Sequence, residues 1–85
     1  MELKANLLKL AIEWIIAQVE PVEGDTLTGD PDVWLIEPYL VDYEGQLVPW
    51  AEHSSEREFN VRSSDITVVT NPSKAILARY IECLE

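Results

Sequence analysis

The residues that could do chemistry are scattered along this chain, and their spacing does not form a catalytic set. His53 is the only histidine, and its sequence neighbours are Glu52, Ser54, Ser55 and Glu56. A Ser–His–acid triad requires three groups that converge in space, and neighbours within one polar loop rarely hold that geometry. Without a nucleophile, a base and an oxyanion donor that could converge, we expect no enzymatic activity. His53 is then an exposed loop histidine.

Metal-binding chemistry is also weakly supported. Glu23, Asp25, Asp30 and Asp32 carry the oxygen ligands that Ca²⁺ prefers, but their order is not that of a loop that wraps the ion. The single cysteine, Cys83, excludes an internal disulfide and a multi-cysteine metal site. We therefore expect a solvated acidic loop, no metal, no cofactor and a partly buried Cys83.

The charge of the chain limits its partners. Sixteen Asp and Glu residues stand against six Lys and Arg, which gives a formal net charge of −10. Affinity for nucleic acid depends on Lys and Arg that neutralise phosphates, so such an excess of acid repels a polyanion unless the cations gather in one place. The 85 residues are 47% hydrophobic, which predicts one folded domain over 1–85. The sequence has no apolar run long enough to span a membrane and no basic N-terminal region of a signal peptide, so we expect a cytoplasmic protein.

The last third of the chain gives the clearest secondary-structure signals. Two β-rich runs, Phe59–Arg62 and Asp65–Thr70, are separated by only two small polar residues. This spacing predicts a hairpin with a tight turn. Asn71 and Pro72 then suit the cap and first turn of a helix, and the apolar stripe that follows extends the predicted helix over about 72–84.

The middle of the chain predicts strands joined by polar segments. Pro38 interrupts an apolar run, and because proline lacks a ladder donor we expect the strand to bend or lose a partner there. In chain order the predicted segments are a loop over 20–32, a strand over Val33–Ile36 that resumes at Tyr39–Val41, a turn over Asp42–Gly45, a strand from Gln46 to Val48 and a loop over 51–58.

Taken together, the marks of this chain resemble the Sm-like (LSm) family, and more narrowly a group of marine, cyanophage-associated Sm-like proteins. The resemblance covers about residues 7–81. The marks are Leu8-Lys9-Leu10, Glu13-Trp14-Ile15-Ile16-Ala17, Ile36-Glu37-Pro38, Leu47-Val48-Pro49-Trp50, Phe59-Asn60-Val61, and Asn71-Pro72-Ser73 with Tyr80. It implies a small, strongly bent five-stranded barrel of the SH3-like kind over about 7–70, a C-terminal helix, and subunits that close into a ring.

The first twenty residues allow two interpretations. Leu3, Leu7, Leu10 and Trp14 follow helical spacing, and the family's glycine ahead of Glu13 is missing, which favours a helix. The alternative is two strands, Leu7–Leu10 and Trp14–Val19. We choose the strands, because a barrel built only from the later segments would have too few strands to close.

The resemblance also nominates site residues. In Sm-like rings the residue at the place of Arg62 faces the pore and binds an RNA base; the alternative is that Arg62 pairs with Asp65 or with a neighbouring subunit. Ser63 stands where the family has glycine. Asp32 stands where RNA-binding members have asparagine, and a carboxylate has no donor for a base edge. Trp50 would stack on a base, or instead belong to the core or a subunit interface.

Two functions follow from these observations. The first is a homo-oligomeric ring of five to seven copies that binds RNA weakly through Arg62. In this hypothesis the first and last strands leave open sheet edges that the ring covers. The second is an acidic protein-interaction scaffold or nucleic-acid mimic of phage origin, which engages a basic partner instead of RNA.

Overall fold

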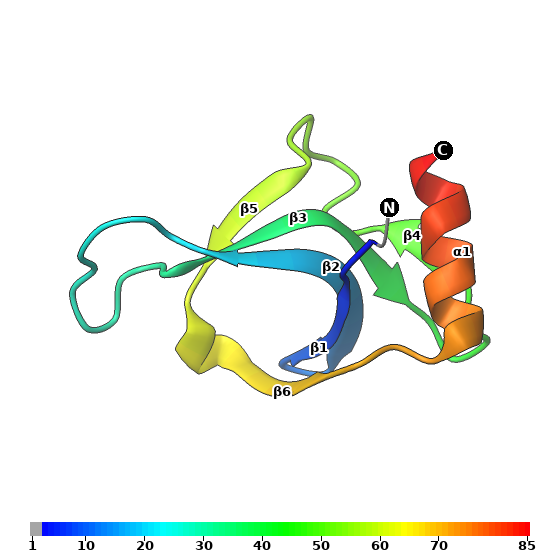
Figure 1. Ribbon diagram of the computed structural model, residues 1–85, viewed down its shortest axis with the longest axis horizontal. Helices are drawn as coiled ribbons and strands as arrows, with labels where there is room; N and C mark the ends of the chain where they lie inside the picture. Colours follow the sequence, from blue (N-terminus) through cyan, green and yellow to red (C-terminus); the bar gives the residue numbers. More distant parts are fainter. Residues whose placement is uncertain (1–2) are drawn as a thin grey trace.

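The protein is mostly β, with one curled antiparallel sheet and one C-terminal helix (Figure 1). The computed structural model describes residues 3–85. The sheet order is β4-β3-β2-β1-β6, and β5 also pairs with β3. The elements are β1 (Asn6–Leu10), β2 (Glu13–Pro21), β3 (Val33–Val41), β4 (Leu47–Pro49), β5 (Glu58–Val61), a 3₁₀ turn (Ser63–Asp65), β6 (Ile66–Thr70) and α1 (Lys74–Leu84).

The first two strands form a hairpin, so the choice of strands over a long N-terminal helix is confirmed. Leu8 lies opposite Ile15 and Leu10 lies opposite Glu13 in the β1–β2 register. The turn between them is made without glycine, because Ala11 itself adopts a left-handed conformation with φ 54°. The helical alternative suggested by the spacing of Leu3, Leu7, Leu10 and Trp14 is therefore wrong.

The bend expected at Pro38 is present, and β3 continues through it. Ile16 pairs with Tyr39 and Gln18 pairs with Ile36, so Glu37 and Pro38 together face a single residue of β2. This two-against-one arrangement is a β-bulge, which bends the strand. Glu37 has φ 50° at this point. On the other side of β3, the strand that begins as β4 breaks and resumes as β5, so residues 50–57 bypass the bulge.

The hairpin predicted between Phe59–Arg62 and Asp65–Thr70 is wrong. β5 pairs with β3, whereas β6 pairs with β1, and the 3₁₀ turn carries the chain from one side of the curled sheet to the other. The prediction that the first strand is an open edge is wrong for the same reason. Within residues 3–85, β1 lies between β2 and β6, and the two edges are β6 and the interrupted β4/β5 strand.

The C-terminal helix begins slightly later than predicted. Ser73, and not Asn71, is its cap: the Ser73 hydroxyl accepts a hydrogen bond from the Ile76 amide at 3.2 Å. Tyr80 is the one helix residue that is fully buried, and its side chain packs against the sheet. Cys83 is exposed, so its predicted burial is wrong.

Apolar side chains fill both faces of the curled sheet. One cluster is centred on Leu8, Ile15, Ala17 and Leu35, and the other joins the sheet to the helix through Ala5, Ile16 and Tyr80. Adjacent residues Ile15 and Ile16 point to opposite faces, as the two-residue period of a strand requires. The sheet is therefore packed on both sides, with α1 covering only one of them (Figure 1).

Candidate functional site

Three of the four predicted site residues meet at one end of the sheet. Asp32 ends the β2–β3 loop, and Arg62 and Ser63 lie at the 3₁₀ turn between β5 and β6. Together with residues of the β2–β3 loop they line a surface hollow of about 330 Å³. The Asp32 amide donates to the carbonyl of Val61 at 3.1 Å, which fixes the loop against β5. We call this hollow the loop site.

Asp32 holds the 3₁₀ turn in place. Its two carboxylate oxygens accept hydrogen bonds from the Ser63 amide at 2.6 Å and from the Ser63 hydroxyl at 2.7 Å. The hydroxyl bond is the larger cause, and the amide bond the second, of a lowered pKa for the Asp32 carboxyl. The carboxylate is thus occupied by the protein's own donors, so it stabilises the loop conformation.

Arg62 pairs within its own chain. The Arg62 Nε donates to Asp65 Oδ2 at 2.9 Å across the 3₁₀ turn. Both side chains are about half exposed, so the pair lies in solvent and is weak. The guanidinium is therefore positioned at the rim of the loop site, but Asp65 neutralises much of its field.

Trp50 lies outside the loop site. Its ring packs edge-to-face on Phe59, with centroids 5.3 Å apart, and rests against the core cluster that contains Leu8. Trp50 and His53 do line one common hollow of about 290 Å³, near Glu13. The Trp50 indole lies 3.5 Å from the Glu13 carboxylate, at the limit of a hydrogen bond. Burial of the ring favours the core interpretation of Trp50.

Arg57 has a structural role that the sequence did not reveal. Its guanidinium donates to the carbonyls of Trp50 at 3.0 Å and of Pro38 at 2.7 Å. It also lies 3.6 Å from the Glu37 carboxylate and over the ring of Tyr39. The Pro38 carbonyl also accepts a hydrogen bond from the Trp50 amide at 3.0 Å, so Arg57 adds side-chain donors at the point where β3 is bulged and β4 ends. An arginine in a polar loop gives no sequence signal for this.

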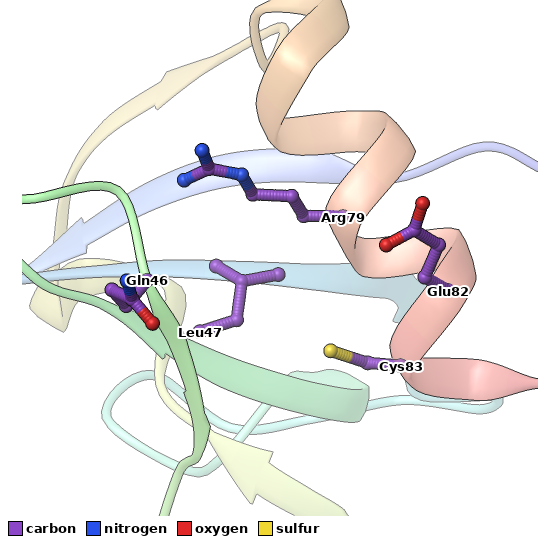
Figure 2. A pocket seen from close by; sticks show the side chains of 5 residues that line it. All are labelled: Gln46, Leu47, Arg79, Glu82 and Cys83. Carbon is purple, nitrogen blue, oxygen red and sulfur yellow. The ribbon is translucent and has the colours of Figure 1, made fainter.

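A further hollow of about 410 Å³ lies between α1 and the start of β4. Figure 2 shows Arg79 and Cys83 projecting from the helix toward Gln46 and Leu47. The Arg79 guanidinium donates to the Gly45 carbonyl at 2.6 Å, which ties the helix to the β3–β4 turn. A Cβ at Gly45 would lie 2.9 Å from that guanidinium, so Arg79 would have to shift, and the φ of 78° at this position also favours glycine.

Within residues 3–85, no group of three or more His, Cys, Asp or Glu side chains could together hold a metal ion. In the same part of the chain, none of the helical structure is long and apolar enough to cross a membrane.

Fold and loop site together define a small antiparallel β protein with a curled sheet, a helix on one face and a polar hollow at one end. The chain belongs to a family of unknown function, DUF6561, whose model matches residues 1–85. Comparison with curated proteins gave no match.

Proposed function

We propose that the protein is an Sm-like module that assembles into a homo-oligomeric ring of five to seven copies. The observation that carries this proposal is the strand arrangement. β6 pairs with β1, so β6 and β4/β5 are the two edges of the described sheet. Pairing of one edge with the other edge of a second copy is heterologous, and repetition of such a contact gives a ring when the rotation between copies closes and an open filament when it does not. We propose the closed ring.

Exposed apolar residues on β6 support the proposal that a second copy covers this edge. Val68 is 39% exposed and Val69 is 60% exposed in the single chain. An edge strand that keeps such residues in solvent favours pairing with another chain. Ring formation removes that liability and accounts for both edges at once.

RNA binding is the first candidate for what the ring does, and we propose that it is weak and depends on Arg62. Copies of Arg62 at the loop site would form the local cation cluster that the net charge of −10 otherwise denies. Ser63 and Asp32 would act only by positioning the turn, because their polar atoms bond to each other. Trp50 contributes little in this proposal, since its half-buried ring packs against the core cluster outside the loop site.

Protein interaction is the second candidate. The Arg62–Asp65 pair and the Asp32 carboxylate leave little free positive charge at the loop site. An acidic ring of this kind would repel RNA and attract a basic protein surface.

Native mass spectrometry distinguishes the candidates, with the protein measured alone and with oligo-U and oligo-A. We expect a closed oligomer, and Arg62→Ala should lower any RNA affinity by about tenfold or more while leaving the oligomer intact. Lys74→Ala is the control, because Lys74 is an exposed cation on α1, away from the loop site. A stable monomer at micromolar concentration would contradict the ring. RNA binding that survives Arg62→Ala, or that hardly changes with salt, would contradict the role of Arg62.

A further inference from the structure

A second groove lies at the opposite end of β2 and β3 from the loop site. β2 begins and β3 ends there, so the β1–β2 turn and the β3–β4 turn are neighbours in the sheet. Residues of both turns line a groove of about 450 Å³, which we call the turn groove. Its lining includes Lys9, Ile12, Glu13, Trp14, Asp42 and Tyr43.

Large apolar side chains stand exposed on both sides of the turn groove. Ile12 is 90% exposed at the tip of the β1–β2 turn, and Tyr43 is fully exposed at the tip of the β3–β4 turn. Turn tips usually carry glycine, asparagine, aspartate or serine, because these residues suit turn backbones. A lone exposed apolar residue needs no explanation, whereas two that flank one groove offer a partner apolar contact on both of its sides.

The floor of the turn groove continues the face of the sheet that the helix covers elsewhere. Trp14 lies opposite Lys9 on β1 and opposite Val41 on β3. Val41 packs against the cluster that contains Tyr80, under α1, whereas Trp14 lines the groove and is only half-buried. The Lys9 ammonium lies 5.6 Å from the centre of the Trp14 ring. The Trp14 ring thus lines the groove with the Lys9 ammonium over it.

Charge favours a basic occupant. Two carboxylates, Glu13 and Asp42, border the turn groove against one ammonium, Lys9, and Glu44 follows Tyr43 in the same turn. The net charge of −10 adds a long-range field that attracts cations and repels a second copy of this chain. We propose that the turn groove binds a Lys/Arg-rich segment of a partner protein, with its large apolar side chains seated between Ile12 and Tyr43. This deepens the second candidate function and does not depend on ring formation or on RNA.

Three synthetic peptides test the proposal on the full-length, ¹⁵N-labelled protein: Lys-Arg-Leu-Phe-Arg-Lys, its acidic counterpart Glu-Asp-Leu-Phe-Asp-Glu, and Lys-Arg-Ser-Ser-Arg-Lys. We expect the first peptide to shift the amide resonances of Ile12 and Tyr43 and the indole resonance of Trp14 in a saturable way. The other two peptides should bind more weakly, because each lacks either the charge or the apolar groups.

Serine variants locate the binding. Ile12→Ser and Tyr43→Ser should each weaken binding of the basic apolar peptide about fivefold or more, as removal of an interface anchor does. Leu27→Ser is the matched control: Leu27 is 78% exposed, but it lies in the β2–β3 loop at the other end of β2, and its substitution should leave the affinity unchanged.

Several results would overturn the proposal. They are the lack of a saturable shift at about 1 mM peptide, equal binding of the acidic or the serine peptide, and unchanged affinity in both serine variants. Self-association that Ile12→Ser abolishes would assign the groove to a second copy instead. Sedimentation of wild type and the same variants separates this test from the test of the ring. Wild-type protein that sediments as a monomer but still binds the peptide would contradict the ring and support the turn groove.

Discussion

Tyr80 connects the helix to the sheet at the place where β3 is bent. Its hydroxyl donates toward the carbonyl oxygen of Glu37 at 2.9 Å, and the Ile36 carbonyl oxygen lies 3.3 Å away. These carbonyls flank the bulge, where the ladder with β2 is irregular. The Tyr80 ring also meets Tyr39 edge-on, with centroids 5.8 Å apart. A single buried phenol thus combines apolar packing with the donor that the bent backbone needs.

We predict that Tyr80→Phe destabilises the protein by about 1 kcal/mol, because the variant keeps the ring but leaves partly buried carbonyls without this donor. Burial is the main cause of a raised pKa for the Tyr80 phenol. The unfolded chain therefore releases this proton first, and stability falls as the pH rises above the ordinary tyrosine pKa of about 10. Tyr80→Phe should lose less stability than wild type over that alkaline range.

Thermal unfolding followed by circular dichroism between neutral pH and about pH 11 measures both effects. Tyr39 remains in the variant, and its own pKa is raised by burial, so part of the alkaline loss should persist. Tyr43→Phe is the control, because Tyr43 is fully exposed and its hydroxyl should not matter for stability. A Tyr80→Phe protein as stable as wild type would show that the two carbonyls have other donors.

At the scale of elements, the β1–β2 turn is built from residues that do not favour it. Ala11 has φ 54°, a conformation that costs an alanine about 1–2 kcal/mol and that glycine adopts freely. The turn nevertheless forms, because Leu8, Ile15 and Ile16 are fully buried only when the two strands are paired. Burial of such side chains contributes about 1.5–3 kcal/mol each, which outweighs the local cost.

We predict that Ala11→Gly stabilises the protein by about 0.5–1 kcal/mol, since relief of the left-handed strain exceeds the added entropy of the unfolded chain. Urea unfolding should show a higher midpoint with an unchanged slope. Ile12→Gly is the matched control: Ile12 is not in the left-handed region, so glycine there brings only the entropic loss and should lower the midpoint. A lower midpoint for Ala11→Gly would mean that the turn is not strained at this residue.

Local sequence patterns predict the helix, turns and bends of this fold better than they predict which strands pair. The bend at Pro38, the Asp42–Gly45 turn and the C-terminal helix depend on short-range chemistry, and each is present. The Phe59–Thr70 segment was misread as a hairpin because the spacing of two runs says how short their connection is, but not which strands each will join. Strand pairing is decided by burial across the whole sheet.

The same distinction applies to the candidate site. Asp32, Arg62 and Ser63 were chosen through a resemblance, and they do lie together, because the loop before β3 and the turn after β5 are adjacent once β5 pairs with β3. The pairing of Arg62 with Asp65 was one of the two alternatives for Arg62, and the structure contains it. The hydrogen bonds of Asp32 to Ser63 join residues far apart in the sequence and could not be predicted from spacing. The role of Arg57 gives no sequence signal, since the Pro38 and Trp50 carbonyls come together only when β3 bends and pairs with β4 and β5.

At the scale of the whole molecule, charge opposes the proposed assembly. Each copy carries a formal net charge of −10, and a ring brings several such copies within contact distance. Among exposed charges, repulsion is screened over about 10 Å at 0.1 M salt and over about 30 Å at 0.01 M salt. Apolar contacts and backbone pairing along the β6 and β4/β5 edges change much less with salt. Repulsion should therefore decide how the assembly responds to ionic strength.

We predict that the oligomer becomes more stable as salt is added, because screening weakens the repulsion between copies while the edge contacts remain. Sedimentation velocity at a fixed micromolar concentration, in buffers from about 0.01 M to 1 M monovalent salt, should show the fraction of monomer falling as ionic strength rises. Lys74→Glu, which adds negative charge to each copy on α1, should shift this curve toward higher salt without changing the copy number. An assembly that dissociates as salt is added would instead be held by ion pairs between copies, and the paired strand edges could not be its main contact.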